Sequence, residues 1–383
     1  MKYLTFPTLV TSSCPPTGQS LSPGYLIPRV LVTGGSGFIG SHLVDALLDE
    51  GFRVRVFDSL DTGYIQYLNV SHPRLELLVG SILDLDAVRK AVDGVSGVFH
   101  LAAASKVAPS LKDPLMATVN VQVNGIGTAN LLQTCVEMGS VTRFVYAASS
   151  TYYGNQKVPF SETDPFVPSS PYAASKFMGE LLTLTYDKVF NLPSINLRFF
   201  MVYGPRQPTT GGYAIVTGKF MQQYSSGEHL TVQGTGDQFR DFIHISDIVR
   251  GLILAFHSEA RGVTINLGSG EKYSVQEVAD MISLNQTRLP ARPHDLQGTL
   301  ANTSLAESLL GFRPEKHFVN ETLKMKKTAN ETYINPFWTS NKTISLLTAI
   351  IPGYVGMSLD DQNEKIRSTI HQLGLSAFLQ YLM

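Results

Sequence analysis

The stretch RVLVTGGSGFIGSHLVDAL occupies residues 29–47 and decides the fold of this chain. It joins a β-branched run to a helical pattern through a turn that contains Gly34, Gly37 and Gly40. Glycines at such a turn let the backbone approach a pyrophosphate, which then lies at the N-terminus of the helix. The spacing is G-x-x-G-x-x-G, and three glycines alone are weak evidence because glycine also serves plain turns. The strand before the turn and the helix after it favour a dinucleotide-binding unit.

The next strand-like run, RVRVFD at residues 53–58, ends in Asp58. A carboxylate at this position can accept hydrogen bonds from both ribose hydroxyls and repels a 2′-phosphate. No arginine follows Asp58 closely enough to offset that repulsion. The sequence therefore favours NAD over NADP as the cofactor.

Short β-branched runs alternate with helical stretches from residue 29 to about residue 200, after which the pattern loosens. This alternation predicts an α/β fold, a Rossmann-type doubly wound parallel sheet with ligands beyond the carboxyl ends of its strands. The looser part predicts a smaller, partly interleaved C-terminal substrate-binding lobe. We expect these parts: an N-terminal extension, 1–28; an NAD-binding domain, 29–200, with a return segment at about 237–270; a substrate lobe, 201–236 and 271–327; and a C-terminal extension of unassigned role, 328–383.

The composition excludes several classes of protein. Lys plus Arg number 30 and Asp plus Glu 31, so no basic surplus indicates a nucleic-acid partner. Cys14 and Cys135 are the only cysteines, which excludes a disulfide framework and a cysteine zinc cluster and suits a reducing compartment. No histidine pair has metal-ligand spacing, and no apolar run approaches the roughly 20 residues that span a bilayer. We expect a cytoplasmic protein with no metal and no membrane partner.

The segment SPYAASK, residues 170–176, places Tyr172 and Lys176 four residues apart behind Pro171. This spacing puts both side chains on one helix face, and the proline suits the first helical turn. An ammonium beside a phenol favours the phenolate, so Tyr172 could act as a base near neutral pH. Taken alone, the pattern fits a solvated surface pair equally well.

With these motifs together, the chain resembles the extended short-chain dehydrogenase/reductase family, in particular its nucleotide-sugar epimerases and dehydratases. The resemblance runs from about residue 29 to about residue 325. No single motif is decisive, but ten in family order are specific. They are TGGSGFIG, the acid Asp58, GSILD, HLAA, NGIGT, YAASSTYYG, PYAASK, LRFFMVYGPRQ, GTGDQFRDFIHISD and ARPHD.

The resemblance implies the roles of the catalytic residues. Tyr172 is the base, Lys176 binds the nicotinamide ribose and lowers the pKa of the tyrosine, and Ser149 relays the proton between the sugar and Tyr172. A free tyrosine has a pKa of about 10, and each unit of lowering requires about 1.4 kcal/mol of preferential phenolate stabilisation.

The resemblance also implies the cofactor contacts. Ser81 stands where the family usually has an aspartate near the adenine, and His100 is interpreted as a structural residue at a strand end. The expected cofactor-binding residues are Gly34, Gly37, Phe38, Ile39, Gly40, Asp58, Ser81, Ile82, Leu101, Ala102, Ala103, Asn124, Tyr172 and Lys176.

The residues after Ser149 indicate which reaction follows the oxidation of the sugar. Family dehydratases carry Asp-Glu at this position and decarboxylases keep a Glu, whereas this chain has Ser150 and Thr151. Without a carboxylate pair, elimination is poorly supported. No additional Cys or Lys is evident for 3,5-epimerisation. The remaining route is NAD-dependent epimerisation at C4 of a UDP-hexose or UDP-N-acetylhexosamine through a 4-keto intermediate.

By resemblance, Arg240 binds the diphosphate, Arg292 and Asp295 bind the nucleotide, and Thr299, a small residue, leaves room for an N-acetyl group at C2 of the sugar. Arginine suits phosphate because its planar fork can hold two oxygens. Lys106, Met201 and His294 depart from the family pattern. The expected substrate-binding residues are Lys106, Ser149, Thr151, Tyr172, Met201, Arg240, Arg292, Asp295 and Thr299.

Two alternatives stay open: a nucleotide-sugar oxidoreductase or dehydratase of the same family, and a catalytically retired protein that binds NAD or a sugar nucleotide. The resemblance further implies a homodimer in which the predicted helices at about 115–138 and 171–190 pair with their copies.

Overall fold

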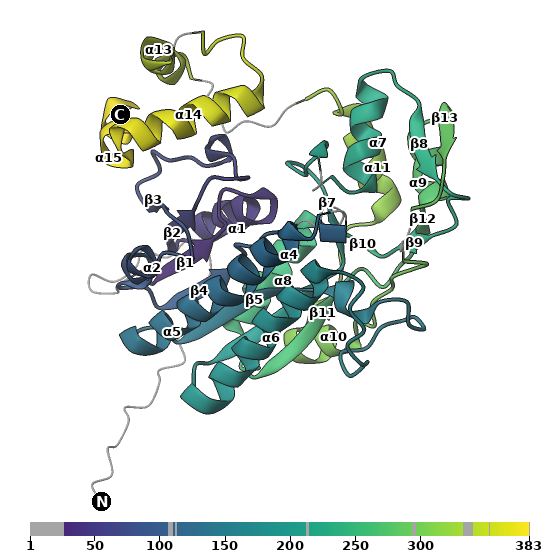
Figure 1. The fold of residues 1–383 in the computed structure, drawn as a ribbon, viewed down its shortest axis with the longest axis horizontal. Helices are drawn as coiled ribbons and strands as arrows, with labels where there is room; N and C mark the ends of the chain where they lie inside the picture. Colours follow the sequence, from purple (N-terminus) through teal and green to yellow (C-terminus); the bar gives the residue numbers. More distant parts are fainter. Residues whose placement is uncertain are drawn as a thin grey trace, which may run out of the picture.

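A computed structural model describes residues 27–105, 110–111, 113–211, 214–292, 296–331, 340–351 and 353–382. Within these residues, seven strands form one parallel sheet, and helices cover both of its faces (Figure 1). The strands are β1 (Arg29–Thr33), β2 (Arg53–Asp58), β3 (Leu75–Val79), β4 (Gly97–His100), β5 (Arg143–Ser149), β6 (Ser194–Phe199) and β11 (Val263–Leu267). Their order in the sheet is β11-β6-β5-β4-β1-β2-β3. This doubly wound order confirms the predicted α/β fold class.

Two helical layers enclose the sheet. The helices are α1 (Phe38–Asp49), α2 (Leu85–Val92), α4 (Leu115–Asn120), the π-helical segment η2 (Val121–Gly127), α5 (Thr128–Met138), α6 (Pro171–Phe190), α8 (Ile245–His257) and α10 (Ser304–Leu310), with short 3₁₀ turns η1 (Ile65–Tyr67) and η3 (Ser150–Tyr153). Val30 and Val32 of β1 pack in one hydrophobic cluster with α1 and α8, whereas Leu31 packs in a second cluster with α2 and α5. Successive strand residues point to opposite faces, so both faces need apolar side chains.

A smaller lobe lies beside the carboxyl ends of the large sheet (Figure 1). Its elements are β7 (Met201–Tyr203), α7 (Val216–Ser225), β8 (Leu230–Gln233), β9 (Phe239–Arg240), β10 (Phe242–His244), β12 (Tyr273–Ser274), α9 (Val275–Ile282), β13 (Gln286–Leu289) and α11 (Phe318–Lys327). Between β10 and β12 the chain returns to the large sheet through α8 and β11, which pairs with β6. This return is the interleaving expected from the sequence. The exact domain boundaries remain a prediction.

Three further helices, α13 (Asn341–Ile350), α14 (Leu359–Leu373) and α15 (Leu375–Leu382), follow the small lobe. They lie above β2, β3 and α1 and are drawn in yellow in Figure 1. Ile366, Ile370 and Phe378 belong to the same buried cluster as Leu60 and Ile65, which follow β2. The C-terminal extension therefore packs on the large domain. No described helix is both long and apolar enough to cross a membrane.

A buried ion pair joins α6 to β6. The guanidinium of Arg198 donates to both carboxylate oxygens of Glu180, at 2.6 Å and 3.1 Å, and to the hydroxyl of Tyr153 at 2.7 Å. Both charged side chains are almost completely buried. Burial lowers the pKa of Arg198, but the hydrogen bonds and charge of Glu180 outweigh it and raise that pKa above its ordinary value. Removal of either partner would leave an uncompensated charge inside the protein.

We predict that Arg198→Ala destabilises the protein by about 3–5 kcal/mol, because it leaves the buried carboxylate of Glu180 without its charged partner. Arg261→Ala is the matched control, since Arg261 pairs with Asp187 of the same helix but is partly exposed. That variant should lose about 1 kcal/mol or less. Urea unfolding followed by circular dichroism measures both. Equal losses in the two variants would contradict the prediction.

Candidate active site

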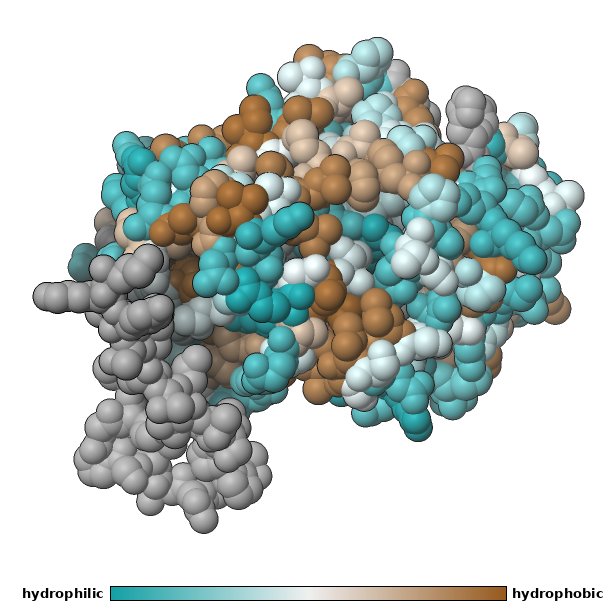
Figure 2. Space-filling view, turned by 90° about the horizontal axis from the view of Figure 1, so that it is seen from below, coloured by the Kyte–Doolittle hydropathy of each residue, from teal (hydrophilic) through white to brown (hydrophobic). Residues whose placement is uncertain are grey.

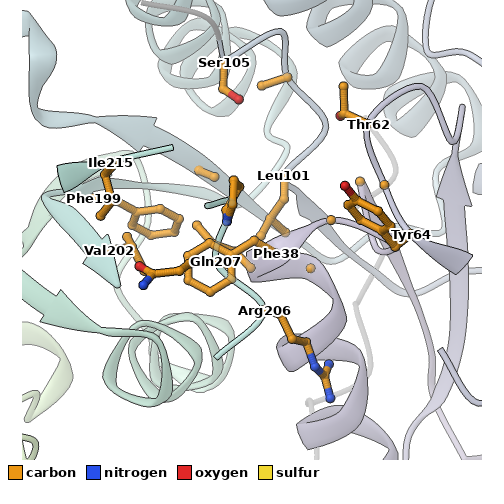
Figure 3. A pocket seen from close by; sticks show the side chains of 18 of the residues that line it. Phe38, Thr62, Tyr64, Leu101, Ser105, Phe199, Val202, Arg206, Gln207 and Ile215 are labelled. Atoms are coloured by element: carbon orange, nitrogen blue, oxygen red, sulfur yellow. The ribbon is translucent and has the colours of Figure 1, made fainter. Parts of the chain in front are cut away.

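One cavity of about 1600 Å³ lies where the parallel strands end. Gly34, Asp58, Leu101, Ser149 and Phe199, each at or just after the carboxyl end of β1, β2, β4, β5 or β6, line it. Single-ligand pockets measure about 300–1,000 Å³, so this cavity has room for two ligands. Figure 3 shows Thr62 and Tyr64 at one end, Ile215 and Phe199 at the other, and Phe38 and Leu101 between them.

The glycine turn of the first βα unit is shaped for close backbone approach. Gly34 has φ +70°, and a Cβ atom there would lie 2.8 Å from the backbone nitrogen of Ala102. A Cβ atom on Gly40 would collide with the carbonyl oxygen of Gly34. Helix α1 starts at the N-cap Gly37, with no side-chain cap and no acidic residue in its first turn. Gly37, Phe38 and Ile39 at this N-terminus line the cavity, so the helix can receive an anionic pyrophosphate there.

Asp58 occupies the position expected for a ribose-binding acid. Its carboxylate is buried at the cavity wall and accepts hydrogen bonds from the backbone N–H of Ser36 at 2.9 Å and of Leu60 at 2.8 Å. Burial raises the pKa of Asp58, while these two hydrogen bonds act in the opposite direction. Each carboxylate oxygen keeps a further lone pair, so the group can still accept from two ribose hydroxyls.

Most of the other residues expected at the cofactor also line the cavity: Gly37, Phe38, Ile39, Gly40, Ser81, Ile82, Ala102 and Ala103. Asn124 does not. Its amide bonds the backbone N–H and carbonyl of Ala104 at 2.8 Å and 3.1 Å and the hydroxyl of Ser175 at 2.9 Å. It thus ties the loop after β4 to α6, and its contact with the cofactor stays a prediction. His100 is satisfied by Thr33 and Thr128, and burial lowers its pKa to about 3.

The three expected catalytic residues meet at the cavity wall. Ser149 ends β5, and Tyr172 and Lys176 project from the first two turns of α6. The hydroxyls of Ser149 and Thr151 lie 2.9 Å apart. The ammonium of Lys176 lies 4.3 Å from the centroid of the Tyr146 ring.

Burial shifts the pKa values of Tyr172 and Lys176 in opposite directions, each toward the uncharged form of the side chain. Tyr172 keeps part of its surface open to the cavity, yet its protein surroundings raise its pKa to about 12, and a hydrogen bond with Ser149 only partly offsets this. Burial lowers the pKa of Lys176 to about 7, against the opposing charge of Glu180. The low dielectric of the site raises the energy of both charged forms.

On the substrate side, Thr151, Met201, Arg240 and Thr299 line the cavity. One guanidinium nitrogen of Arg240 also donates to the carbonyls of Phe239 and Leu296, at 2.8 Å and 2.9 Å, which holds the side chain in place.

Arg292, also expected at the substrate, is not part of the cavity lining. It is exposed and follows the mostly exposed edge strand β13. The contact of Arg292 with the nucleotide stays a prediction. Lys106 and Asp295, also expected at the substrate, lie outside the described residues, as does His294.

Several lining residues were not singled out from the sequence: Thr62, Tyr64, Ser105, Asn120, Arg206, Gln207, Leu359 and Asp360. Arg206 and Gln207 fall in the motif LRFFMVYGPRQ, and that motif was the available signal. Arg206 pairs with Asp45 at 2.7 Å and so ties the small lobe to α1. Leu359 and Asp360 belong to α14 and carry no sequence signal at all.

Comparison with known proteins agrees with this geometry. The family model described as GDP-mannose 4,6 dehydratase matches residues 31–325. A UDP-N-acetyl-alpha-D-glucosaminuronate decarboxylase of Bacillus cytotoxicus is 34% identical over 260 residues, which are 66% of this chain and 79% of that protein.

Two solved structures share the fold. A UDP-N-acetylglucosamine 4-epimerase from Methanobrevibacter ruminantium M1, in complex with UDP-N-acetylmuramic acid, has a TM-score of 0.74 and 32% identity over 79% of this chain and 97% of that one. A UDP-glucuronic acid 4-epimerase from Bacillus cereus, in complex with UDP-glucuronic acid and NAD, has a TM-score of 0.73 and 29% identity over 80% of this chain and 100% of that one. The chain belongs to the NAD-dependent nucleotide-sugar epimerase and dehydratase family of extended short-chain dehydrogenases/reductases.

Proposed function

We propose that this protein is an NAD-dependent 4-epimerase of a nucleotide-activated sugar, a UDP-hexose or UDP-N-acetylhexosamine. The observation that carries the proposal is the set Ser149, Tyr172 and Lys176 at one cavity wall, with Ser150 and Thr151 in place of carboxylates. The similarity to 4-epimerases that act on UDP-sugars supports it. We place the protein in the cytoplasm, which suits a buried Cys135 with a free thiol.

Each residue at the cavity wall has a separate role in the proposed reaction. NAD, held at Gly34, Gly37 and Asp58, would supply the acceptor and donor of a hydride for C4 of the sugar. Tyr172 is the base, and Ser149, hydrogen-bonded to Tyr172, relays the proton of the C4 hydroxyl to it. Lys176 supplies positive charge that favours the phenolate, and Glu180, held by Arg198, favours the charged form of Lys176. Gly34, Gly37 and Asp58 hold the dinucleotide at the glycine turn and the ribose.

The same geometry argues against elimination. Expulsion of a hydroxyl at C6 needs an acid and a base beside the keto sugar, and the side chains after Ser149 are hydroxyls that do not ionise near neutral pH. A reaction that only oxidises and then re-reduces C4 needs no further group. Epimerisation therefore needs fewer catalytic groups in this site than elimination does.

We predict that Tyr172→Phe lowers turnover by about a hundredfold or more, because it removes the base but keeps the ring. The variant should keep its fold and its NAD. Tyr186→Phe is the matched control, since it makes the same change farther along α6, where Tyr186 contacts Phe190. Interconversion of UDP-sugars, resolved by chromatography, is the measurement. Wild-type turnover in Tyr172→Phe would disprove the proposed mechanism, and net NADH formation by the wild type would indicate an oxidoreductase instead.

We predict that Thr299 sets the width of the sugar pocket. Thr299 is buried at the cavity wall, where its backbone N–H donates to the carbonyl of Phe239 at 3.1 Å. A phenol ring there would occupy the volume that an acetamido group at C2 needs, and packed walls yield little. Thr299→Tyr should suppress UDP-N-acetylglucosamine conversion at least about tenfold more than UDP-glucose conversion, whereas Thr299→Ser should change neither. An equal loss of both substrates would show that Thr299 is not at C2.

We also propose that the protein is a homodimer. Seen from below, hydrophobic side chains gather in patches between hydrophilic ones (Figure 2). Helices α5 and α6 lie side by side on the surface of the large domain (Figure 1). Large apolar side chains of these helices and their neighbours α4 and η2 are exposed: Leu115, Val121, Ile126, Met138, Leu181, Val189 and Phe190. A two-fold axis would pair this face with the same face of a second copy.

We predict that Val189→Glu shifts the protein from dimer to monomer, because it places a charge in this apolar interface. Leu284→Glu is the control, since Leu284 is exposed on the small lobe, away from α6. Light scattering at micromolar concentration measures the mass of each variant. A monomeric wild type would reject the proposal.

A further inference from the structure

Helix α14 is bound to the loop that follows Asp58. The hydroxyl of Tyr64 donates to the carboxylate of Asp360 at 2.5 Å. The amide of Asn363 donates to the carbonyl of Gly63 at 3.0 Å, and the guanidinium of Arg367 donates to the carbonyls of Leu60 and Asp61 at 3.0 Å and 3.2 Å. We call residues 59–64 the ribose loop, because Asp58 precedes it and accepts from its Leu60 N–H.

Apolar packing holds the helix in this place. Ile366 and Ile370 are buried, as are Leu60 and Ile65 on the other side of the contact, and all four belong to one hydrophobic cluster. The hydrogen bonds therefore lie on a packed interface and not on a loosely tethered tail.

The same helix reaches the cavity. Leu359 and Asp360 line it together with Asp58, Asp61 and Tyr64. Two adjacent carboxylates of α14 have different tasks, since Asp361 bonds the N-cap hydroxyl of Ser358 whereas Asp360 bonds Tyr64 at the cavity. Burial and the bond to Asp360 raise the pKa of Tyr64, so its hydroxyl stays a donor to that carboxylate.

This helix lies beyond the part of the chain that matches the family. The family model ends at residue 325, and the two solved 4-epimerases are matched over 97% and 100% of their lengths by 79% and 80% of this chain. The core of the family thus contains the glycine turn and the catalytic set. The wall contributed by Leu359 and Asp360 lies outside the residues that the family model matches.

We propose that α14 is a cofactor-retaining element that completes the wall of the NAD site at the ribose loop and strengthens its preference for NAD over NADP. The inference rests on the proposed function. Asn363 and Arg367 hold the carbonyls of the ribose loop, so the loop cannot open without breaking these bonds. The carboxylate of Asp360 adds to those of Asp58 and Asp61 and repels a 2′-phosphate. An epimerase regenerates NAD in every turnover, so slow NAD release does not limit its rate.

The first experiment measures NAD release from the full-length protein. Asn363→Ala with Arg367→Ala removes three hydrogen bonds to the ribose loop and should speed release of NAD at least about tenfold. Glu364→Ala with Lys365→Ala is the control, because both side chains are exposed on the same helix. Bound NAD is displaced by excess NADH, and stopped-flow fluorescence follows the NADH that binds as NAD is released. Equal release rates in the two double variants would overturn the proposal.

The second experiment leaves the docking bonds of Asn363 and Arg367 intact. Asp360→Asn should reduce the ratio of NADP to NAD dissociation constants by about threefold or more, since it removes one carboxylate from the wall. Asp361→Asn removes the neighbouring charge and should leave the ratio unchanged. An unchanged ratio in Asp360→Asn would reject the role of Asp360. Sugar interconversion is assayed separately. If the wild type interconverts sugars but the variants release NAD at the wild-type rate, only the role of α14 is rejected. If the wild type retains NAD but interconverts no sugar, only the epimerase function is rejected.

Discussion

The close approach of α6 to β5 and η2 is the constraint on which the active site depends. A Cβ atom on Gly179 would collide with the hydroxyl of Tyr146, and one on Gly125 would collide with Met178. The hydroxyl of Tyr146 donates to the carbonyl of Lys176 at 3.1 Å across this contact. Because Tyr172 and Lys176 precede Gly179 by seven and three residues, all three share one helix face. The glycine that lets the helix approach thereby also places the base and the ammonium at the end of β5, beside Ser149.

Charge is the second element of this arrangement. The site buries Lys176 and encloses Tyr172, and the low dielectric that results disfavours the ammonium and the phenolate alike. Glu180, one turn beyond Lys176, favours the ammonium, and its own charge is compensated by Arg198 of β6. The ion pair of Glu180 and Arg198, which anchors α6 to the sheet, thus also acts on Lys176 of the catalytic set. Stability and catalysis share the same residues here, which explains why a buried ion pair lies behind the active site.

Cofactor handling and the type of reaction are also connected. The cavity is large enough for a dinucleotide and a sugar nucleotide, and one of its ends is walled by a helix from the C-terminal extension. An oxidoreductase that exchanges its cofactor would be slowed by such a wall, whereas a redox-neutral epimerase would not. The absence of a carboxylate after Ser149 and the α14 wall near Asp58 therefore favour the same reaction from two separate parts of the structure.

The parts of this protein that are encoded locally can be read from the amino-acid sequence. The glycine turn, Asp58 at a strand end, Ser149 and the Tyr172–Lys176 spacing can be recognised because each depends on a few adjacent residues of one element. Only the tertiary structure decided that Asn124 ties a loop to α6, that Arg292 faces solvent and that burial raises the pKa of Tyr172, because burial and charge are sums over segments distant in the chain. The same holds for α14: Tyr64 and Asp360 are 296 residues apart, and no periodicity in an amphipathic helix specifies the surface on which it docks.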